Sequence, residues 1–326
     1  MDTTARIVGI FRDEMRLPAV SADGNFFDLG GDSLMAENII LAVQEAFAVK
    51  LQTSVLLKAS TPRDLAAVVQ GQRHAGDLSR LVTEISGGTE KPAMVMVHGM
   101  GGSSLFANRL DDTIRSRARI LAMRGMGLGE GEAPLDDADE ISGLYLDAAR
   151  SYAGQTPNIF GGICVGGLIA LTMGLKAQTE SGKRPQLVLI DPPPLGSLWL
   201  KPVKAGRDAK ARRGSLDRQV RFWRAVSRVC ERFGLGRSVI GRKARRENFK
   251  KSLTRAFAGF TPASYPCDVL LVASSQWGET TLADYQKWLG PEASIRTAVM
   301  PGQHRDFQRV NRDRINATIR EFLGLE

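Results

Sequence analysis

Residues 158–178 read NIFGGICVGGLIALTMGLKAQ, and this stretch decides the fold of most of the chain. Asn158-Ile159-Phe160 is a short apolar strand, and the apolar run from Leu168 to Gln178 indicates a helix. Between them, Gly162-Ile163-Cys164-Val165-Gly166 has a glycine two places before Cys164 and another two places after it. These glycines let the chain turn sharply and let the strand and the helix pack without Cβ clashes. The stretch therefore predicts a strand–turn–helix unit with Cys164 at a helix N-terminus, where the helix dipole favours a thiolate.

The strand pattern recurs outward from this turn. Five other short apolar stretches are separated by segments long enough for helices: 93–97, 119–123, 186–190, 268–273 and 294–299. Strands that alternate with helices predict a parallel, doubly wound α/β sheet. Functional side chains of such sheets gather at the carboxyl ends of the strands, so the residues that follow the strands are the candidates for chemistry.

Two polar residues follow predicted strands in the order that a catalytic triad requires. Asp191 ends the strand at 186–190, and His304 follows the strand at 294–299. The order Cys164, Asp191, His304 is that of nucleophile, acid and base in an α/β-hydrolase. His304 would remove or return a proton, and Asp191 would fix its tautomer and offset its charge. Simpler readings are a buried turn cysteine, a turn-initiating aspartate and a surface-loop histidine.

The loop after the strand at 93–97 supplies the remaining parts of such a site. It reads His98-Gly99-Met100-Gly101-Gly102. The backbone N–H groups of Met100 and Val165 are the candidates for an oxyanion hole, and Gly101 allows close approach. His98 is a poor candidate for the base because it lies in this loop. We expect it to position the loop, and the sequence leaves its role open.

Residues 1–75 read as a separate, small helical bundle. Apolar residues recur at helical spacing near the N-terminus, and a second amphipathic helix is predicted from Leu34 to Phe47. Thr61-Pro62 predicts the start of a third helix, because threonine caps helices and proline suits the first helical position. Residues 76–92 predict a linker that can carry a short helix from Leu78 to Ile85. Residues 93–326 form the second predicted domain.

Composition argues against several classes of protein. The 326 residues are 43% hydrophobic, which excludes wholesale disorder. No run of about 18 apolar residues is present, so we expect no membrane span. The N-terminal residues lack the layout of a signal peptide, so we expect a cytoplasmic protein. Cys164, Cys230 and Cys267 are too few and too scattered for a disulfide framework or a cysteine-rich metal site, and no metal is expected.

The stretch Phe26-Phe27-Asp28-Leu29-Gly30-Gly31-Asp32-Ser33-Leu34 resembles the signature of a peptidyl carrier protein. With the turn at Cys164, Asp191 and the C-terminal Gly-x-His, the chain resembles the last two domains of a nonribosomal peptide synthetase. These are a carrier and a type I thioesterase of the α/β-hydrolase fold with a helical lid, and the resemblance covers nearly the whole chain. It implies a covalent 4′-phosphopantetheine arm on Ser33, which a phosphopantetheinyl transferase adds. It also implies a peptidyl or acyl thioester substrate from upstream synthetase modules. The simpler reading of Ser33 is a capping serine in a glycine-rich turn.

The sequence departs from the family at the nucleophile, where Cys164 stands in place of serine. Transfer of an acyl group from a pantetheine thioester to cysteine gives another thioester, so the acyl-enzyme stays reactive toward a weak or hindered nucleophile. We therefore expect release by intramolecular cyclisation. Cysteine-type relatives are associated with strained four-membered rings, β-lactams and β-lactones. Hydrolysis to a linear acid is the alternative, and a non-catalytic carrier and docking module is the alternative from another class.

The formal charge of +9 comes from one segment. Residues 195–265 hold 19 basic and 4 acidic residues, a net charge of +15, and the resemblance places the lid here. Two helices are predicted, from Val220 to Phe233 and from about Ala244 to Phe257. The charge suits a solvated outer face, docking of the acidic carrier domain with its phosphate, or an anionic acyl substrate. Nucleic-acid binding is not expected, because no matching motif is present.

Overall fold

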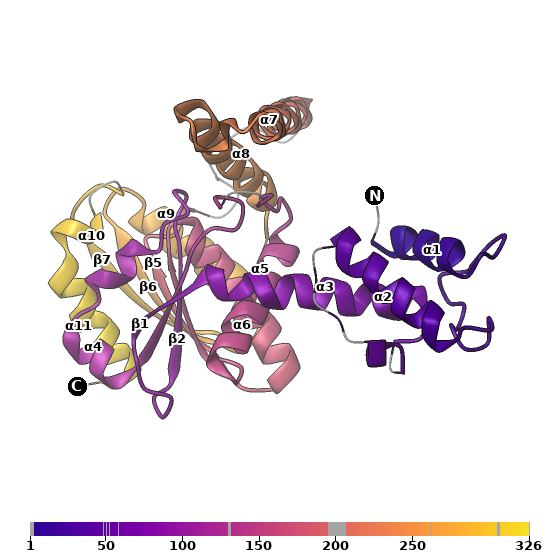
Figure 1. The fold of residues 1–326 in the computed structure, drawn as a ribbon. Coiled ribbons are helices and arrows are strands. Elements are labelled where there is room, and N and C mark those ends of the chain that lie inside the picture. The colour runs from indigo at the N-terminus through magenta and orange to yellow at the C-terminus, as the bar shows by residue number, and fades with distance from the viewer. Residues whose placement is uncertain are drawn as a thin grey trace. The chain divides into compact units, whose positions relative to one another are not determined.

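The computed structural model describes residues 3–47, 49, 51, 53–57, 59–129, 132–194, 207–261, 263–304 and 307–325. The chain forms two compact units, Met1–Ser79 and Arg80–Glu326. The first unit is made of helices and the second is built around a sheet (Figure 1). The predicted fold class, a small helical bundle followed by an α/β domain, is confirmed.

The described part of the first unit is formed by α1 Thr3–Glu14, α2 Ser33–Phe47 and α3 Pro62–Leu78, with a 3-10 helix at Thr53–Leu57. Their apolar faces meet in one core, which includes Ile7, Phe11, Ile39, Val43, Leu65 and Val69. Pro62 begins α3 as predicted, and Thr61 Oγ1 accepts a hydrogen bond of 3.1 Å from the backbone N–H of Asp64. Helical periodicity and capping chemistry thus account for this unit.

A seven-stranded sheet with the order β1-β3-β2-β4-β5-β6-β7 is the centre of the second unit. Strands β2 to β7 are parallel, and β1 is an antiparallel edge strand. Their bounds are Val82–Ser86, Ala93–Val97, Arg119–Met123, Ile159–Ile163, Gln186–Ile190, Asp268–Ser274 and Ser294–Met300. The segments that follow β2, β4, β5, β6 and β7 therefore emerge along one edge of the sheet.

The segment 76–92 differs from the predicted linker. Helix α3 runs to Leu78, a 3-10 turn spans Ser79–Leu81, and β1 follows, so the short helix predicted from Leu78 to Ile85 was wrong. The reason is a tertiary contact: β1 pairs with β3, and Glu84 of β1 forms a 3.0 Å ion pair with Arg119 of β3. Pairing with a distant strand overrides a weak local preference for helix.

Helices cover both faces of the sheet: α4 Asp112–Arg117, α5 Ala138–Ala153, α6 Val165–Ser181, α9 Gly278–Leu289, α10 Phe307–Val310 and α11 Arg312–Leu323. In Figure 1, α4 and α11 lie on one side of the sheet and α6 on the other. The core beside α4 and α11 includes Met94, Met96, Ile114, Ile120, Ile315 and Ile319. Burial on both faces explains why the inner strands β2 to β6 read as continuous apolar runs.

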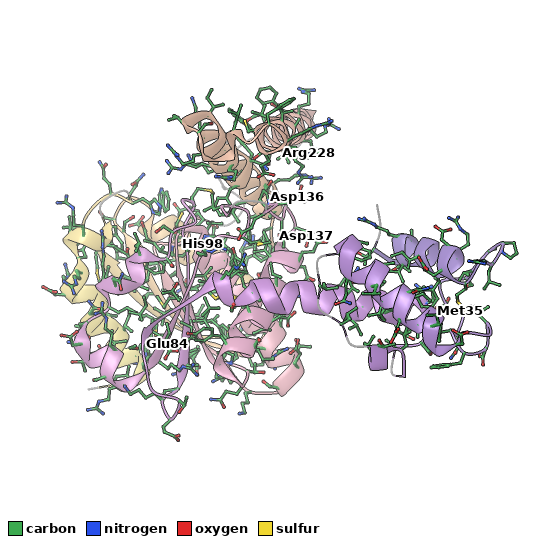
Figure 2. All side chains as sticks on the ribbon, in the orientation of Figure 1. Met35, Glu84, His98, Asp136, Asp137 and Arg228 are labelled. Carbon is green, nitrogen blue, oxygen red and sulfur yellow. The ribbon has the colours of Figure 1, made fainter. Side chains whose placement is uncertain are left out.

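The described residues between β5 and β6, where the lid is predicted, include two helices: α7 Arg207–Arg232 and α8 Val239–Phe257. They pack against each other, and each begins earlier than the helix predicted there. Residues 195–206 of the predicted lid lie outside the described residues. Asp136, labelled in Figure 2, forms ion pairs with Arg224 of α7 and Arg255 of α8. Part of the positive charge of the lid is therefore neutralised within the protein.

Within the described ranges, no helix has the length and apolar character needed to cross a bilayer. The same ranges contain no group of three or more His, Cys, Asp or Glu side chains arranged to hold a metal ion.

Candidate active site

Cys164 occupies the turn between β4 and α6, with φ 56° and ψ −130°. A residue other than glycine is strained at positive φ, typically by about 1–3 kcal/mol, and such strain is a feature of nucleophile turns. Glycine is required on both sides of the turn. A Cβ on Gly162 would lie 2.2 Å from the carbonyl oxygen of Gly166, and a Cβ on Gly166 would lie 2.3 Å from that of His98. The turn thus presents a buried cysteine at a helix N-terminus.

Asp191 and His304 lie far apart in the sequence, and the fold brings them into contact. Asp191 follows β5, and its side chain is 1% exposed. Its Oδ2 lies 2.6 Å from Nδ1 of His304, and its Oδ1 accepts a 2.7 Å hydrogen bond from the backbone N–H of Ser274. Both carboxylate oxygens are therefore engaged, and the imidazole is held with Nδ1 toward Asp191.

Cys164 is the third member of the set, and it interacts electrostatically with His304. Burial lowers the pKa of His304, but the hydrogen bonds to Asp191 and Cys164, with the charges of both groups, raise it to about 9. His304 is therefore protonated at neutral pH, so a positive charge lies beside Cys164. The structure brings the three predicted triad residues together.

Three consecutive residues after β6 hold the loop of His304, and the sequence did not point to them. Ser275 Oγ accepts a 3.3 Å hydrogen bond from the N–H of Gly302, and Gln276 Oε1 accepts one of 3.0 Å from the N–H of His304. The ring of Trp277 stacks on that of His304, with centroids 4.3 Å apart and planes 27° apart. Their position directly after the end of a strand is the sequence feature from which they could have been predicted.

The loop after β2 adjoins the nucleophile. A Cβ on Gly99 would lie 3.7 Å from Cβ of Cys164, and the N–H of Gly102 donates a 2.9 Å hydrogen bond to the carbonyl oxygen of Gly99. Met100 lies inside this tight turn, and Val165 is the first residue of α6, directly after Cys164. Both predicted oxyanion donors thus belong to segments that adjoin Cys164.

His98 is fully buried at the start of this loop. Its Nδ1 lies 2.8 Å from the carbonyl oxygen of Gly99, and its Nε2 lies 2.7 Å from the hydroxyl of Tyr145. Burial lowers the pKa of His98 to about 4, so the ring is neutral at physiological pH. Because both nitrogens have partners, His98 is not available as the general base.

A cavity of about 290 Å³ lies beside His304. Its lining residues are Leu105, Phe106, Arg109, Ile163, His304 and Gln308. Ligand pockets usually measure roughly 300–1,000 Å³, so this one suits a short acyl group better than a long chain. A larger cavity of about 400 Å³, lined by residues of α5, α6 and the segment after α8, contains no triad residue. We therefore associate the smaller cavity with the chemistry.

The predicted carrier site lies at the start of α2. Ser33 is the first residue of this helix, and Oδ1 of Asp32 accepts a 2.8 Å hydrogen bond from the N–H of Met35, labelled in Figure 2. Asp32 rather than Ser33 is thus the cap, which argues against the reading of Ser33 as a capping serine. The flanking Leu34 is 67% exposed.

Family models match both units. Residues 5–69 match the model of the phosphopantetheine attachment site, and residues 92–214 match that of the thioesterase domain. A dimodular nonribosomal peptide synthase from Bacillus subtilis is 28% identical over 200 residues, which cover 61% of this chain and 8% of the synthase. Tyrocidine synthase 3 from Brevibacillus parabrevis is 38% identical over 66 residues, 20% of this chain and 1% of that protein. The chain thus spans a small fraction of the length of these relatives.

Solved structures show the same fold. A holo four-domain nonribosomal peptide synthetase bound to AMP and glycine has a TM-score of 0.52 at 20% identity, over 98% of this chain and 26% of that one. The NocB thioesterase domain, in a covalent complex with a fluorophosphonate nocardicin G analogue, has a TM-score of 0.54 at 19% identity, over 74% of this chain and 99% of that domain.

Proposed function

This chain is a carrier–thioesterase didomain of the nonribosomal peptide synthetase type, and on that premise we propose that it releases a carrier-bound peptidyl or acyl group through Cys164. The observation that supports the proposal is the grouping of the three side chains: Oδ2 of Asp191 lies 2.6 Å from Nδ1 of His304, and Cys164 and Asp191 together raise the pKa of His304. A nucleophile in a strained turn, a base and an orienting carboxylate are the parts that covalent acyl transfer needs.

In this proposal Ser33 carries the 4′-phosphopantetheine, whose thiol holds the acyl group as a thioester. The site fits such a group, because Ser33 begins α2 and both flanking residues, Asp32 and Leu34, are exposed to an approaching transferase. A phosphopantetheinyl transferase attaches the group, and upstream synthetase modules supply the peptidyl chain.

The thiolate of Cys164 attacks the carbonyl carbon of the thioester and forms a new C–S bond. Negative charge then develops on the carbonyl oxygen, and in this proposal the N–H groups of Met100 and Val165 stabilise it. The bond to the departing sulfur breaks, and His304 gives that sulfur its proton. Asp191 holds Nδ1 of the ring and offsets its charge until the proton leaves.

Neutral His304 then removes a proton from the group that releases the acyl chain. If this group is a hydroxyl or a nitrogen within the chain, the product is a ring; if it is water, the product is a linear acid. In both cases a bond forms at the acyl carbon while its bond to the sulfur of Cys164 breaks. The proton on His304 remains there beside the regenerated thiolate.

We favour ring closure because the acyl group on Cys164 is a thioester, which retains the activation that an oxoester on serine would lose. That activation matters most when the attacking group is weak or the ring is strained, as in a β-lactam or β-lactone. Hydrolysis competes with ring closure when water reaches the acyl carbon first.

The test is to load Ser33 with N-acetyl-alanyl-seryl-pantetheine and to follow Cys164 and the released products by mass spectrometry. We expect an acyl group on Cys164 followed by release, and neither event in Cys164→Ala. A loaded wild-type protein that never acylates Cys164 would identify a non-catalytic carrier and docking module. Release of linear acid alone would select hydrolysis.

A further inference from the structure

His98 is a buried histidine that the proposed chemistry does not use, and its contacts assign it a role. The hydroxyl of Tyr145 accepts a 2.9 Å hydrogen bond from the N–H of Met126, so its own proton points to Nε2 of His98. Because Nε2 accepts, the proton of the neutral ring resides on Nδ1. Nδ1 then donates to the carbonyl oxygen of Gly99 at 2.8 Å. The donor and the acceptor of each hydrogen bond from Tyr145 through His98 to Gly99 are thereby assigned.

The carbonyl oxygen of Gly99 and the N–H of Met100 belong to one peptide group. In a planar trans peptide these two groups point in opposite directions. His98 and the N–H of Gly102 both bind the Gly99 oxygen, so the direction of the Met100 N–H is set. Gly99 itself adjoins Cys164, since a Cβ on it would lie 3.7 Å from Cβ of Cys164.

The lid completes the enclosure of the ring. Phe249 of α8 lies with its ring centroid 5.5 Å from that of His98. Its ring fills space beside two glycines. A Cβ on Gly102 would lie 3.0 Å from the ring of Phe249, and a Cβ on Gly125 would lie 2.5 Å from it. The imidazole is thus held by Gly99, Tyr145 and Phe249, three segments far apart in the sequence.

We propose that His98 is a positioning residue that orients the backbone N–H of Met100 toward the oxyanion formed at Cys164, with Tyr145 setting its tautomer. The inference rests on the proposed function, and it explains how one donor of the oxyanion hole is held in its orientation. His98 touches neither substrate nor nucleophile and acts through the peptide group between Gly99 and Met100.

Two isosteric substitutions separate the two hydrogen bonds of His98. The amide of His98→Asn places an N–H near the position of Nδ1 and keeps the bond to Gly99. The amide of His98→Gln reaches the position of Nε2 and keeps only the bond to Tyr145. Acylation of Cys164 by N-acetyl-alanyl-pantetheine needs the oxyanion hole, whereas alkylation by iodoacetamide needs only the thiolate.

We expect His98→Gln to acylate about 10- to 100-fold more slowly than wild type, since loss of a whole oxyanion donor costs about 10²–10³. His98→Asn should recover most of that rate, and alkylation should be nearly unchanged in both variants. Equal acylation rates in the two variants would overturn the inference, as would a fall in alkylation that matches the fall in acylation.

Tyr145→Phe provides the same comparison if His98→Gln does not fold. It removes the hydroxyl that sets the tautomer, and we expect slower acylation with unchanged alkylation; unchanged acylation would overturn the inference. Absence of acylation in the wild-type protein would overturn the proposed function, and this inference with it. Normal acylation in both the wild type and His98→Gln would overturn this inference alone.

Discussion

Replacement of Asp191 by asparagine tests the site most sharply, because it changes a charge without changing the shape of the side chain. The amide oxygen can still accept from the N–H of Ser274. The amide nitrogen, however, then faces Nδ1 of His304, which Asp191 Oδ2 contacts at 2.6 Å. Two donors cannot bond to each other, so the imidazolium loses its partner or the ring changes its tautomer.

The magnitude follows from the pKa of His304. A rise from the ordinary value of 6.5 to about 9 corresponds to about 3 kcal/mol of stability, at about 1.36 kcal/mol per unit. Because the folded-state pKa is raised, this contribution is fully present below pH 6.5 and is lost as the pH rises through 9. Asp191 and Cys164 share it, so we expect Asp191→Asn to lose roughly 2 kcal/mol at pH 6 and less above pH 9.

Urea unfolding of the thioesterase unit at pH 6, 8 and 10 measures this difference in the free energy of unfolding between wild type and variant. The matched control is the same substitution in a His304→Gln background, where position 304 has no imidazole to titrate and the pH dependence of the difference should vanish. A difference that stays constant from pH 6 to pH 10 would refute the assignment of the raised pKa to the contact with Asp191.

Substitutions at three further positions test other parts of the proposal. Cys164→Ser should lower the ratio of cyclic to linear product by about tenfold or more, a change of about 1.4 kcal/mol in the difference between the two barriers. Mass spectrometry of the products measures this ratio, and an unchanged ratio would remove the energetic argument for cysteine. Ser33→Ala should abolish the mass increase on incubation with coenzyme A and a phosphopantetheinyl transferase without altering the unfolding curve; continued modification would place the attachment site elsewhere. Trp277→Ala should move the alkaline limb of the acylation rate down by about half a pH unit, because an aromatic face stabilises a cation by roughly 0.5–1 kcal/mol. Trp277→Phe should restore most of that shift, and a pH profile identical to that of wild type in Trp277→Ala would show that the stack is only structural.

Local patterns account for the parts of the fold that the sequence predicts well. The parallel strands β2 to β6 read as apolar runs because helices bury both faces of the sheet there, whereas the edge strand β7 is largely exposed. Pro62 marks the start of α3 because proline suits the first turn of a helix. The glycines around Cys164 are visible in the sequence because no other residue fits that turn.

Contacts between distant segments account for what sequence reasoning missed. The strand β1 depends on pairing with β3, which the residues of 82–86 do not reveal by themselves. Tyr145 is an ordinary apolar position of α5 until its hydroxyl is seen on His98. Phe249 similarly reads as one more apolar residue of a lid helix, although it lies on His98 and two glycines.

The central claim is that the acyl group passes from the carrier to Cys164 before release. Its most direct test is to load Ser33 with N-acetyl-alanyl-seryl-pantetheine, quench the reaction at successive times, and map the acyl mass by peptide mass spectrometry. We expect the acyl mass to leave the peptide of Ser33, to appear on the peptide of Cys164, and then to disappear as product forms. Product formation at the wild-type rate in Cys164→Ala, or without any acyl mass on Cys164 at any time, would contradict it.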